Sequence, residues 1–346
     1  MKNYLWKGLI VAILLTPLLM TNAVAGNKMI VGMATDVNGL GDGSFNDGVY
    51  AGLKQAADSG KIDVRMIESK SMTDFVPNLS GLAEDGASLI FAVGFLMAEA
   101  VVEAAENNPH AMYAGIDLWF DPGKAPKNLQ GITWKEHESG YLAGIVAGYM
   151  TKQYADRSDK LNNKNMVGAV LGMDIPPVER YQAGYWAGVK SVNPGCEVKS
   201  IVTGTFGDPA KGKEATLALV EQGADIVIQL AGLTGMGVID GAKEAGILAI
   251  GADVDQNRFA PDHVLTSALK GTTVATYLTI KDALAGKFKG RINKVYGIAE
   301  GAIDIAPFHA FDSVVPAEVK NAVAKAKKDI ASGKLVVPSS RTQAGF

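Results

Sequence analysis

Glycines and short polar side chains gather in one stretch near the start of the chain, between Asp36 and Asp47. Glycine lets backbone N–H groups come close to a ligand, and asparagine and aspartate add donors and acceptors at the start of a helix. Asn46 and Asp47 end this stretch and are the binding candidates in it. A surface loop that ends in an Asn or Asp N-cap explains the same residues equally well.

A carboxylate and two aromatic rings emerge together at Asp117, Trp119 and Phe120. Aromatic faces beside a fixed acceptor suit a flat heterocycle that carries N–H donors. Trp119 and Phe120 can equally cover the edge of a sheet. The sequence favours a functional role for Asp117 and a structural role for Phe120.

The second half of the chain offers Phe206, Gly232, Asp253 and Lys270. Phe206 is flanked by small residues, so its ring can stack on a ligand, and Gly232 allows a close backbone approach. Asp253 and Lys270 could together hold a hydroxylated ligand. The alternatives are a buried phenylalanine and a surface ion pair of little energetic value.

The sequence lacks the common catalytic patterns. Neither G-x-S-x-G nor a P-loop occurs, and the four histidines show no metal-ligand spacing. Gly39, Gly41 and Gly43 read G-x-G-x-G, which does not match the dinucleotide fingerprint. We therefore expect a protein that is not an enzyme, with no cofactor and no metal.

The candidates depend on an alternation of short apolar runs with amphipathic stretches, which predicts doubly wound α/β sheets. Ligands of such sheets bind beyond the carboxyl ends of the strands, where most of the candidates lie. Strands are predicted at Met29–Thr35, Ile62–Glu68, Ser88–Val93, Ala111–Asp117, Met166–Leu171, Val198–Thr203, Asp225–Leu230 and Ile247–Gly251. Helices are predicted at Asp47–Asp58, Met97–Asn107, Glu138–Lys152, Val178–Val192, Gly212–Glu221, Met236–Glu244, Thr272–Ala285 and Pro316–Ser332.

Two extended segments, at residues 128–133 and 264–267, divide this series into two similar lobes joined by a hinge. The prediction assigns residues 26–131 and about 266–290 to lobe 1. Residues 132–265 and about 291–346 then form lobe 2, and a third crossing is expected before Val295–Ala299.

The pattern of residues 1–25 predicts a cleaved signal peptide. Two lysines precede an apolar run from Gly8 to Met20, which is shorter than the roughly 20 residues of a membrane span. Ala23-Val24-Ala25 supplies a cleavage site. The one cysteine, Cys196, lies far downstream, so we expect a periplasmic protein that is not a lipoprotein.

The formal net charge is −3, and no tract rich in lysine or arginine stands out. Nucleic acid is therefore not expected as a partner. A single cysteine cannot form an intramolecular disulfide, so stability must come from buried cores. We expect a monomer.

Several segments together resemble the basic membrane protein family of ABC-importer receptors, which includes bacterial purine nucleoside receptors. They follow one another over nearly the whole chain beyond residue 25. They are Asp42-Gly43-Ser44-Phe45-Asn46, Glu138-Ser139-Gly140-Tyr141-Leu142-Ala143-Gly144, Tyr181-Gln182-Ala183-Gly184-Tyr185-Trp186-Ala187-Gly188, Phe206-Gly207-Asp208, residues 231–238, residues 250–256 and residues 265–270.

The resemblance implies a type I periplasmic-binding-protein fold, a ligand enclosed between the lobes, and delivery to a permease in the inner membrane. It implies that Asn46 and Asp47 hold the base or sugar and that Asp117 bonds the purine. It further implies that Phe206 stacks on the base. The same family pattern places Gly232, Asp253 and Lys270 at the ribose.

The chain departs from the family in two ways. Many relatives carry a lipoprotein cysteine, and nucleoside receptors have an aromatic residue upstream of Ser-Phe-Asn, whereas Asp36–Gly43 contains none. Trp119 is the candidate replacement. The expected function is binding of a purine nucleoside or base. The alternatives are another small polar solute, such as a sugar or modified purine, a nucleoside-processing enzyme, and a cytoplasmic regulator.

Overall fold

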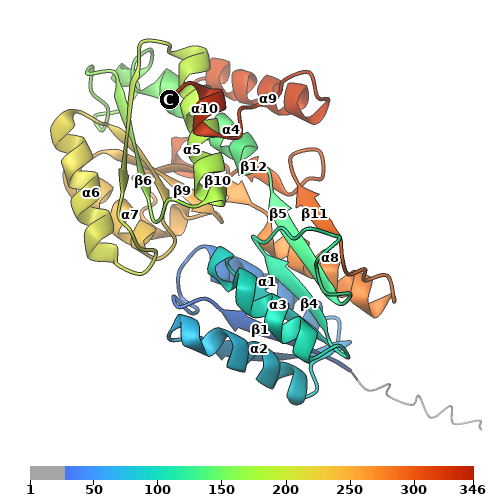
Figure 1. Cartoon of the computed structure of the whole chain (residues 1–346). Helices are drawn as coiled ribbons and strands as arrows, with labels where there is room; N and C mark the ends of the chain where they lie inside the picture. Colours follow the sequence, from blue (N-terminus) through green and yellow to red (C-terminus); the bar gives the residue numbers. More distant parts are fainter. Residues whose placement is uncertain (1–27) are drawn as a thin grey trace, which may run out of the picture.

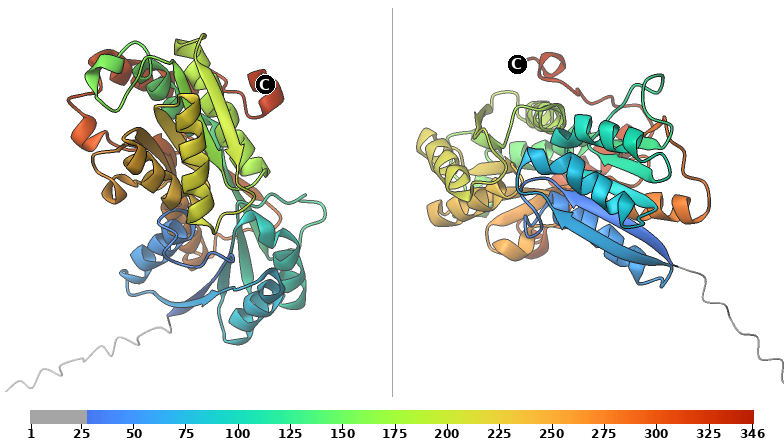
Figure 2. Two further views of the ribbon diagram at one scale, coloured as in Figure 1. Left: turned by 90° about the vertical axis from the view of Figure 1, so that its left-hand side faces the viewer. Right: turned by 60° about the horizontal axis from the view of Figure 1, so that its bottom comes forward.

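The computed structural model describes residues 28–346, so the predicted signal peptide lies outside the described residues. Residues 28–346 form two lobes, each built on a six-stranded sheet (Figure 1). The described chain begins in lobe 1 and ends in lobe 2, at opposite ends of the molecule (Figure 2). In this part of the chain, none of the helices combines the length and apolar character that a membrane span needs.

Lobe 1 contains a parallel sheet with strand order β11-β5-β4-β3-β1-β2. Neighbouring residues of β3 face opposite sides of it, because side chains alternate along a strand. Ile90 packs under helices α2 and α3, and Phe91 packs under α1 and α8. The elements are β1 (Met29–Thr35), α1 (Phe45–Ala57), β2 (Ile62–Glu68), α2 (Phe75–Glu84), β3 (Leu89–Val93), α3 (Ala98–Asn107), β4 (Met112–Ile116), β5 (Leu129–Trp134), α8 (Thr272–Leu284) and β11 (Asn293–Tyr296).

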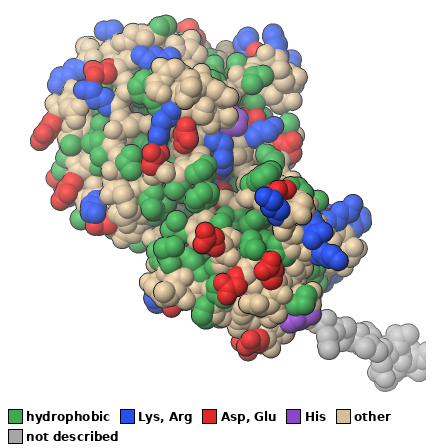
Figure 3. Space-filling model, viewed as in Figure 1, with side chains coloured by type: hydrophobic (Ala, Val, Ile, Leu, Met, Phe, Trp, Pro, Cys, Tyr) green, Lys and Arg blue, Asp and Glu red, His purple; other side chains and the backbone are tan. Residues whose placement is uncertain are grey.

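Lobe 2 repeats this arrangement with strand order β12-β10-β9-β8-β6-β7, and β12 is antiparallel to β10. Its elements are α4 (Glu136–Met150), β6 (Met166–Leu171), α5 (Pro176–Val192), β7 (Glu197–Val202), α6 (Pro209–Gln222), β8 (Ile226–Leu230), α7 (Thr234–Ala245), β9 (Leu248–Asp253), β10 (Val264–Lys270), β12 (Ile303–Ile305), α9 (Ala317–Ala331) and α10 (Arg341–Ala344). Basic and acidic side chains are interspersed over the face of lobe 2 seen in Figure 3.

The prediction of doubly wound α/β lobes is confirmed, and β1, β2 and β6 have the predicted bounds. Helix α2 does not appear among the predicted helices, because Pro77, Ser80 and Gly81 lower its helix propensity. Pro77 lies in the first turn of α2, where its missing N–H breaks no helical bond.

The chain crosses between the lobes after β5, after β10 and between β11 and β12. The predicted ranges 266–290 and 291–346 differ from this arrangement, because β10 belongs to the sheet of lobe 2 and β11 to that of lobe 1. The first sheet also keeps β5 as far as Trp134, beyond the predicted boundary at residue 131. Strand pairing is a long-range property, and these short strands carry no local signal of the sheet they join.

Glycines bring α4 and α5 into backbone contact within lobe 2. A Cβ atom added at Gly144 would lie 2.2 Å from the carbonyl oxygen of Tyr185, and one added at Gly188 would lie 2.1 Å from that of Tyr141. A carbonyl oxygen in a helix cannot move aside as a flexible side chain does. The two helices therefore pack at a distance that only glycine permits.

Gly144→Ala is expected to destabilise the protein by at least about 1–3 kcal/mol, the usual cost of overpacking a core. Gly81→Ala is the matched control, because its new methyl group meets nothing within 4 Å. The control should be neutral or stabilising by up to about 1 kcal/mol, since alanine is the better helix former. Urea unfolding of both variants measures the difference, and equal stabilities would contradict the packing argument.

Candidate functional site

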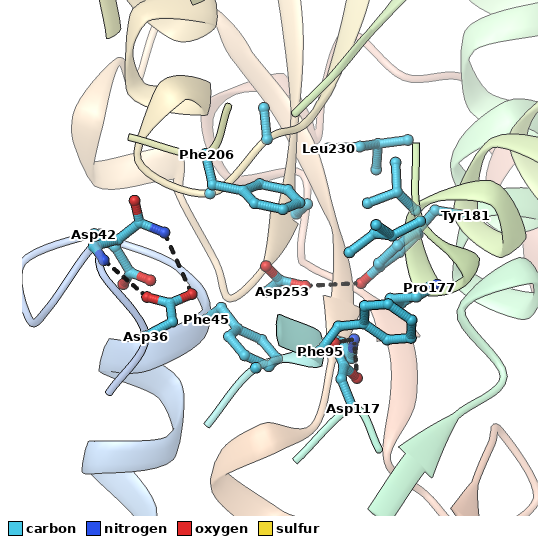
Figure 4. Close-up of a pocket in the computed structure, with 18 of the residues that line it drawn as sticks. Asp36, Asp42, Phe45, Phe95, Asp117, Pro177, Tyr181, Phe206, Leu230 and Asp253 are labelled. Carbon is cyan, nitrogen blue, oxygen red and sulfur yellow. Dashed lines mark hydrogen bonds and ion pairs between the residues drawn. The ribbon is translucent and has the colours of Figure 1, made fainter. Parts of the chain in front are cut away.

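A cavity lies between the lobes, where the carboxyl ends of the two sheets face each other (Figure 4). About 690 Å³ of empty space lies within it, part of it open to solvent. Its lining comes from both lobes and consists of Asp36, Asn38, Asp42, Phe45, Gly94, Phe95, Leu96, Asp117, Ile175, Pro177, Val178, Tyr181, Phe206, Leu230, Ala231, Gly232, Ala252, Asp253 and Lys270.

Aromatic rings line the cavity from opposite sides. Phe45 begins α1 and Phe95 follows β3, so both rings belong to lobe 1, whereas Phe206 comes from the loop after β7 in lobe 2. Figure 4 shows the ring of Phe206 across the cavity from Phe45 and Phe95. Gly232, in the left-handed conformation at φ 56°, lies beside Phe206. A flat ligand can therefore contact aromatic faces from both lobes.

The first loop folds around the carboxylate of Asp42. This carboxylate accepts hydrogen bonds from the backbone N–H groups of Ser44, Asn46 and Asp47, at 3.0, 2.8 and 3.2 Å. Burial raises the pKa of Asp42 to about 6, although these hydrogen bonds lower it. Asp42 therefore stabilises the start of α1 from within the cavity wall.

A second buried carboxylate, that of Asp36, lies beside this loop at the end of β1. Its Oδ1 accepts hydrogen bonds from the backbone N–H of Asn38 at 3.0 Å and from the side-chain amide of Asn46 at 2.9 Å. Burial raises the pKa of Asp36 against these hydrogen bonds. Asp36 lines the cavity and offers an acceptor there.

Each lobe places one aspartate with a left-handed backbone at a strand end: Asp117 after β4, with φ 65°, and Asp253 at the end of β9, with φ 67°. This conformation is strained for a residue other than glycine and recurs at functional sites. Asp253 accepts hydrogen bonds from the hydroxyl groups of Ser44 at 2.6 Å and Tyr181 at 3.2 Å. Since Ser44 belongs to lobe 1, Asp253 joins the two lobes directly.

Lys270 is the cation of the cavity lining. Its Nζ lies 2.6 Å from Asp117 Oδ1 and 3.0 Å from Glu136 Oε1. The same Nζ lies 5.1 Å from the ring centroids of Phe45 and Trp134, a cation–π distance. Burial would lower the pKa of Lys270, but the charges of Asp117 and Glu136 raise it, so the amine stays protonated.

The structure brings five predicted site residues together in the cavity lining: Asp117, Phe206, Gly232, Asp253 and Lys270. The other three predicted site residues lie outside this lining, and hydrogen bonds explain the position of each.

Asn46 is buried behind the first loop, where its amide donates to Asp36 and Asp42. Asp47 accepts from the N–H groups of Gly41 and Gly43 and so shapes the loop itself. Trp119 is 63% exposed, because the backbone of Phe120 is held by two hydrogen bonds to the Asn293 side chain.

Sequence reasoning did not select Asp36, Phe45, Phe95 or Tyr181 as site residues. Asp36 and Phe45 belong to the first loop, and the position of this loop directly after a strand could have identified them as site residues. Phe95 follows β3, and the same signal applies to it. Tyr181 lies within α5, and a position inside a helix gives no indication in the sequence that the side chain lines a cleft.

In residues 28–346, no cluster of three or more His, Cys, Asp and Glu side chains is arranged to hold a metal ion. The cavity instead combines aromatic faces, carboxylate acceptors and one ammonium donor. This combination can hold a flat, polar-edged solute.

Two α/β lobes with a cleft between them form the type I periplasmic-binding-protein fold. A similar solved structure is an ABC-transporter solute-binding protein from Aeropyrum pernix K1, with a TM-score of 0.82 and 28% identity, covering 91% of this chain and 95% of that one. The predicted fold is thus confirmed.

The chain belongs to the Bmp family of ABC transporter substrate-binding proteins, described as PnrA-like, whose family model matches residues 29–340. It is 31% identical over 328 residues to the ABC transporter nucleoside-binding protein BmpA of Lactococcus lactis, covering 89% of this chain and 88% of the relative. The predicted resemblance is therefore confirmed, and the protein is an ABC transporter substrate-binding protein.

The prediction of a periplasmic protein without a lipid anchor is wrong, because several relatives are named lipoproteins. One, from Pyrococcus furiosus, is 35% identical over 80% of this chain and 70% of its own length and is named an uncharacterized lipoprotein. Relatives from Pyrococcus abyssi and Pyrococcus horikoshii carry the same description. The prediction relied on the lack of a cysteine near the apolar run, a segment outside the described residues.

Ser44→Ala should shift the protein towards a more open cleft, because it removes the 2.6 Å hydrogen bond between the lobes. A hydrogen bond to a charged acceptor contributes about 1.5–3 kcal/mol. Small-angle scattering should give a larger radius of gyration than for the wild type. Ser59→Ala, which removes a bond within lobe 1, should leave it unchanged. An unaltered radius in Ser44→Ala would show that Ser44 does not hold the lobes together.

Proposed function

We propose that the cleft binds a purine nucleoside or a free purine base, which the protein delivers, as a monomer and without chemical change, to the permease of an ABC importer. The observation that carries this proposal is the placement of Phe206 opposite Phe45 and Phe95, with carboxylates around the edge of the same cavity. Aromatic faces recognise the flat ring, and the carboxylates recognise donors on its rim.

The base fits the aromatic part of the cavity. Stacking of a base on an aromatic side chain contributes about 1–3 kcal/mol. Purines carry N–H groups on their edges, and the buried carboxylate of Asp36 is an acceptor within the same lining. Phe45 and Phe95 supply the aromatic face that the segment Asp36–Gly43 lacks in sequence.

The sugar fits the part of the cavity beside the hinge. Asp253 and Lys270 lie there together, and a carboxylate with an ammonium group can accept from and donate to vicinal hydroxyls. Each carboxylate oxygen can accept more than one hydrogen bond, so the bonds from Ser44 and Tyr181 leave capacity for a ligand. The relative named a nucleoside-binding protein supports the same assignment.

Titration calorimetry against adenosine, adenine and ribose tests the proposal, with Asp253→Ala as the informative variant. Adenosine is expected to bind the wild type. The variant should lose more affinity for adenosine than for adenine, because both ligands lose the help of the Ser44–Asp253 bond that joins the lobes, but only the nucleoside has hydroxyls for the carboxylate. Binding of ribose alone would reject the purine proposal, and equal losses for adenosine and adenine would show that Asp253 does not contact the sugar.

Phe206→Ala should weaken adenosine binding by one to two orders of magnitude, because a lost stacking contact costs about 1–3 kcal/mol and about 1.4 kcal/mol is tenfold in affinity. Trp119→Ala is the matched aromatic control. Its ring is exposed outside the cavity, so the affinity should stay within about twofold and the stability within about 0.5 kcal/mol. A large loss of affinity in Trp119→Ala and little loss in Phe206→Ala would show that Trp119, and not Phe206, stacks on the base.

A further inference from the structure

Four charged side chains meet at the hinge, beside the cavity. Lys270 contacts Asp117 and Glu136, and Arg180 contacts Glu136 through two bonds, from Nε to Oε2 at 2.5 Å and from Nη2 to Oε1 at 3.2 Å. Glu136 is fully buried, and the side chains of Lys270 and Asp117 are 2% and 8% exposed. The cluster contains two cations and two anions, so its charges balance.

The pairing within the cluster is unequal. Glu136 is the first residue of α4 and is held by both nitrogens of the Arg180 fork, a geometry that favours carboxylates. Lys270 makes its shorter contact with Asp117, at 2.6 Å, and its longer one with Glu136, at 3.0 Å. Both carboxylate oxygens of Asp117 lie within 2.7 Å of the Lys270 ammonium group, which has three N–H donors. One donor shared by these two oxygens and one directed at Glu136 would leave the third for the cavity that Lys270 lines.

We propose that Arg180, which lies outside the cavity lining, is a positioning residue for the binding site. By neutralising Glu136, Arg180 leaves the charge of Lys270 to be balanced by Asp117 and keeps one Lys270 donor available to the solute. The availability of a Lys270 donor to the solute rests on the proposed function, whereas the charge balance rests on the ion-pair geometry alone.

Loss of Arg180 would leave two buried carboxylates against one lysine. An uncompensated buried charge is strongly unfavourable, so the cluster would take up a proton or draw Lys270 fully towards Glu136. The other titratable groups that act on the cluster are Asp253, Tyr181, Glu179 and His137. These are unchanged in the variant, so the difference between variant and wild type reports the removed arginine.

The first test is the stability of the ligand-free protein at pH about 5 and about 8. Lys270 and Arg180 hold the pKa of Glu136 below its usual range against burial, so the stabilisation exists when Glu136 is ionised and is lost as pH falls. Arg180→Met should therefore fall further below the wild type at the higher pH, by about tenfold in the unfolding constant for each unit by which the variant's pKa rises.

Three further variants test whether the loss of stability in Arg180→Met comes from the charge of Glu136. Arg180→Lys should restore much of the stability. The double variant Glu136→Gln with Arg180→Met should show a smaller pH dependence of its gap from the wild type than Arg180→Met does; some can remain, because Asp117, whose pKa burial raises to about 6, titrates in the same range. Arg65→Met, which alters an exposed arginine of β2, should match the wild type. A pH-independent gap for Arg180→Met, or an equally pH-dependent gap for the double variant, would overturn the charge-balance role.

The second test is adenosine affinity of the same variants. Arg180→Met should bind at least about tenfold more weakly at pH about 8 and recover in part at pH about 5, where a proton replaces the arginine charge. Unchanged affinity in Arg180→Met would overturn the positioning role. If the wild type binds no adenosine, the proposed function and the role of Arg180 in solute binding fail together, while the stability test still decides the charge balance.

Discussion

The ion pair between Lys270 and Asp117 is the interaction on which the cleft depends. The two sheets turn the carboxyl ends of their parallel strands towards each other, and aspartates stand at those ends in both lobes. Like charges facing each other across a buried cavity would drive the lobes apart or force protonation. Lys270, at the end of β10 in lobe 2, neutralises the aspartate at the end of β4 in lobe 1, so the two lobes can close over a polar solute.

The carboxylate of Asp253 both helps to close the lobes and is proposed to contact the ligand. The hydroxyl of Ser44 in lobe 1 binds the carboxylate of Asp253 in lobe 2, and the Gln256 amide donates to the carbonyl oxygen of Gly43 at 3.1 Å. A ligand that engages Asp253 therefore acts on a group that also joins the lobes. Such a ligand can shift the balance between open and closed forms only through its different affinity for the two, and Asp253 provides that difference.

Local sequence pattern was enough to predict most strands of the two sheets and three charged strand-end residues of the cleft. Asp117, Asp253 and Lys270 line it because ligands meet the carboxyl ends of parallel strands. Trp119 could not be placed in this way, since its orientation depends on the bonds between Phe120 and Asn293, which are far apart in sequence. The contacts of Glu136 and Arg180 with Lys270 likewise arise only when α4, α5 and β10 pack together.

The hinge also contains a natural optical probe. Trp134 ends β5 at the first crossing, is 1% exposed, and has its ring 5.1 Å from the ammonium group of Lys270. An indole excited state responds to a nearby charge, so the emission of Trp134 depends on where Lys270 stands. The largely exposed Trp119 is open to aqueous quenchers and can be silenced with iodide. Trp186 stacks on Phe346 and also emits, so in a variant that replaces Trp186 the emission of Trp134 reports on the hinge separately from the surface, without any added label.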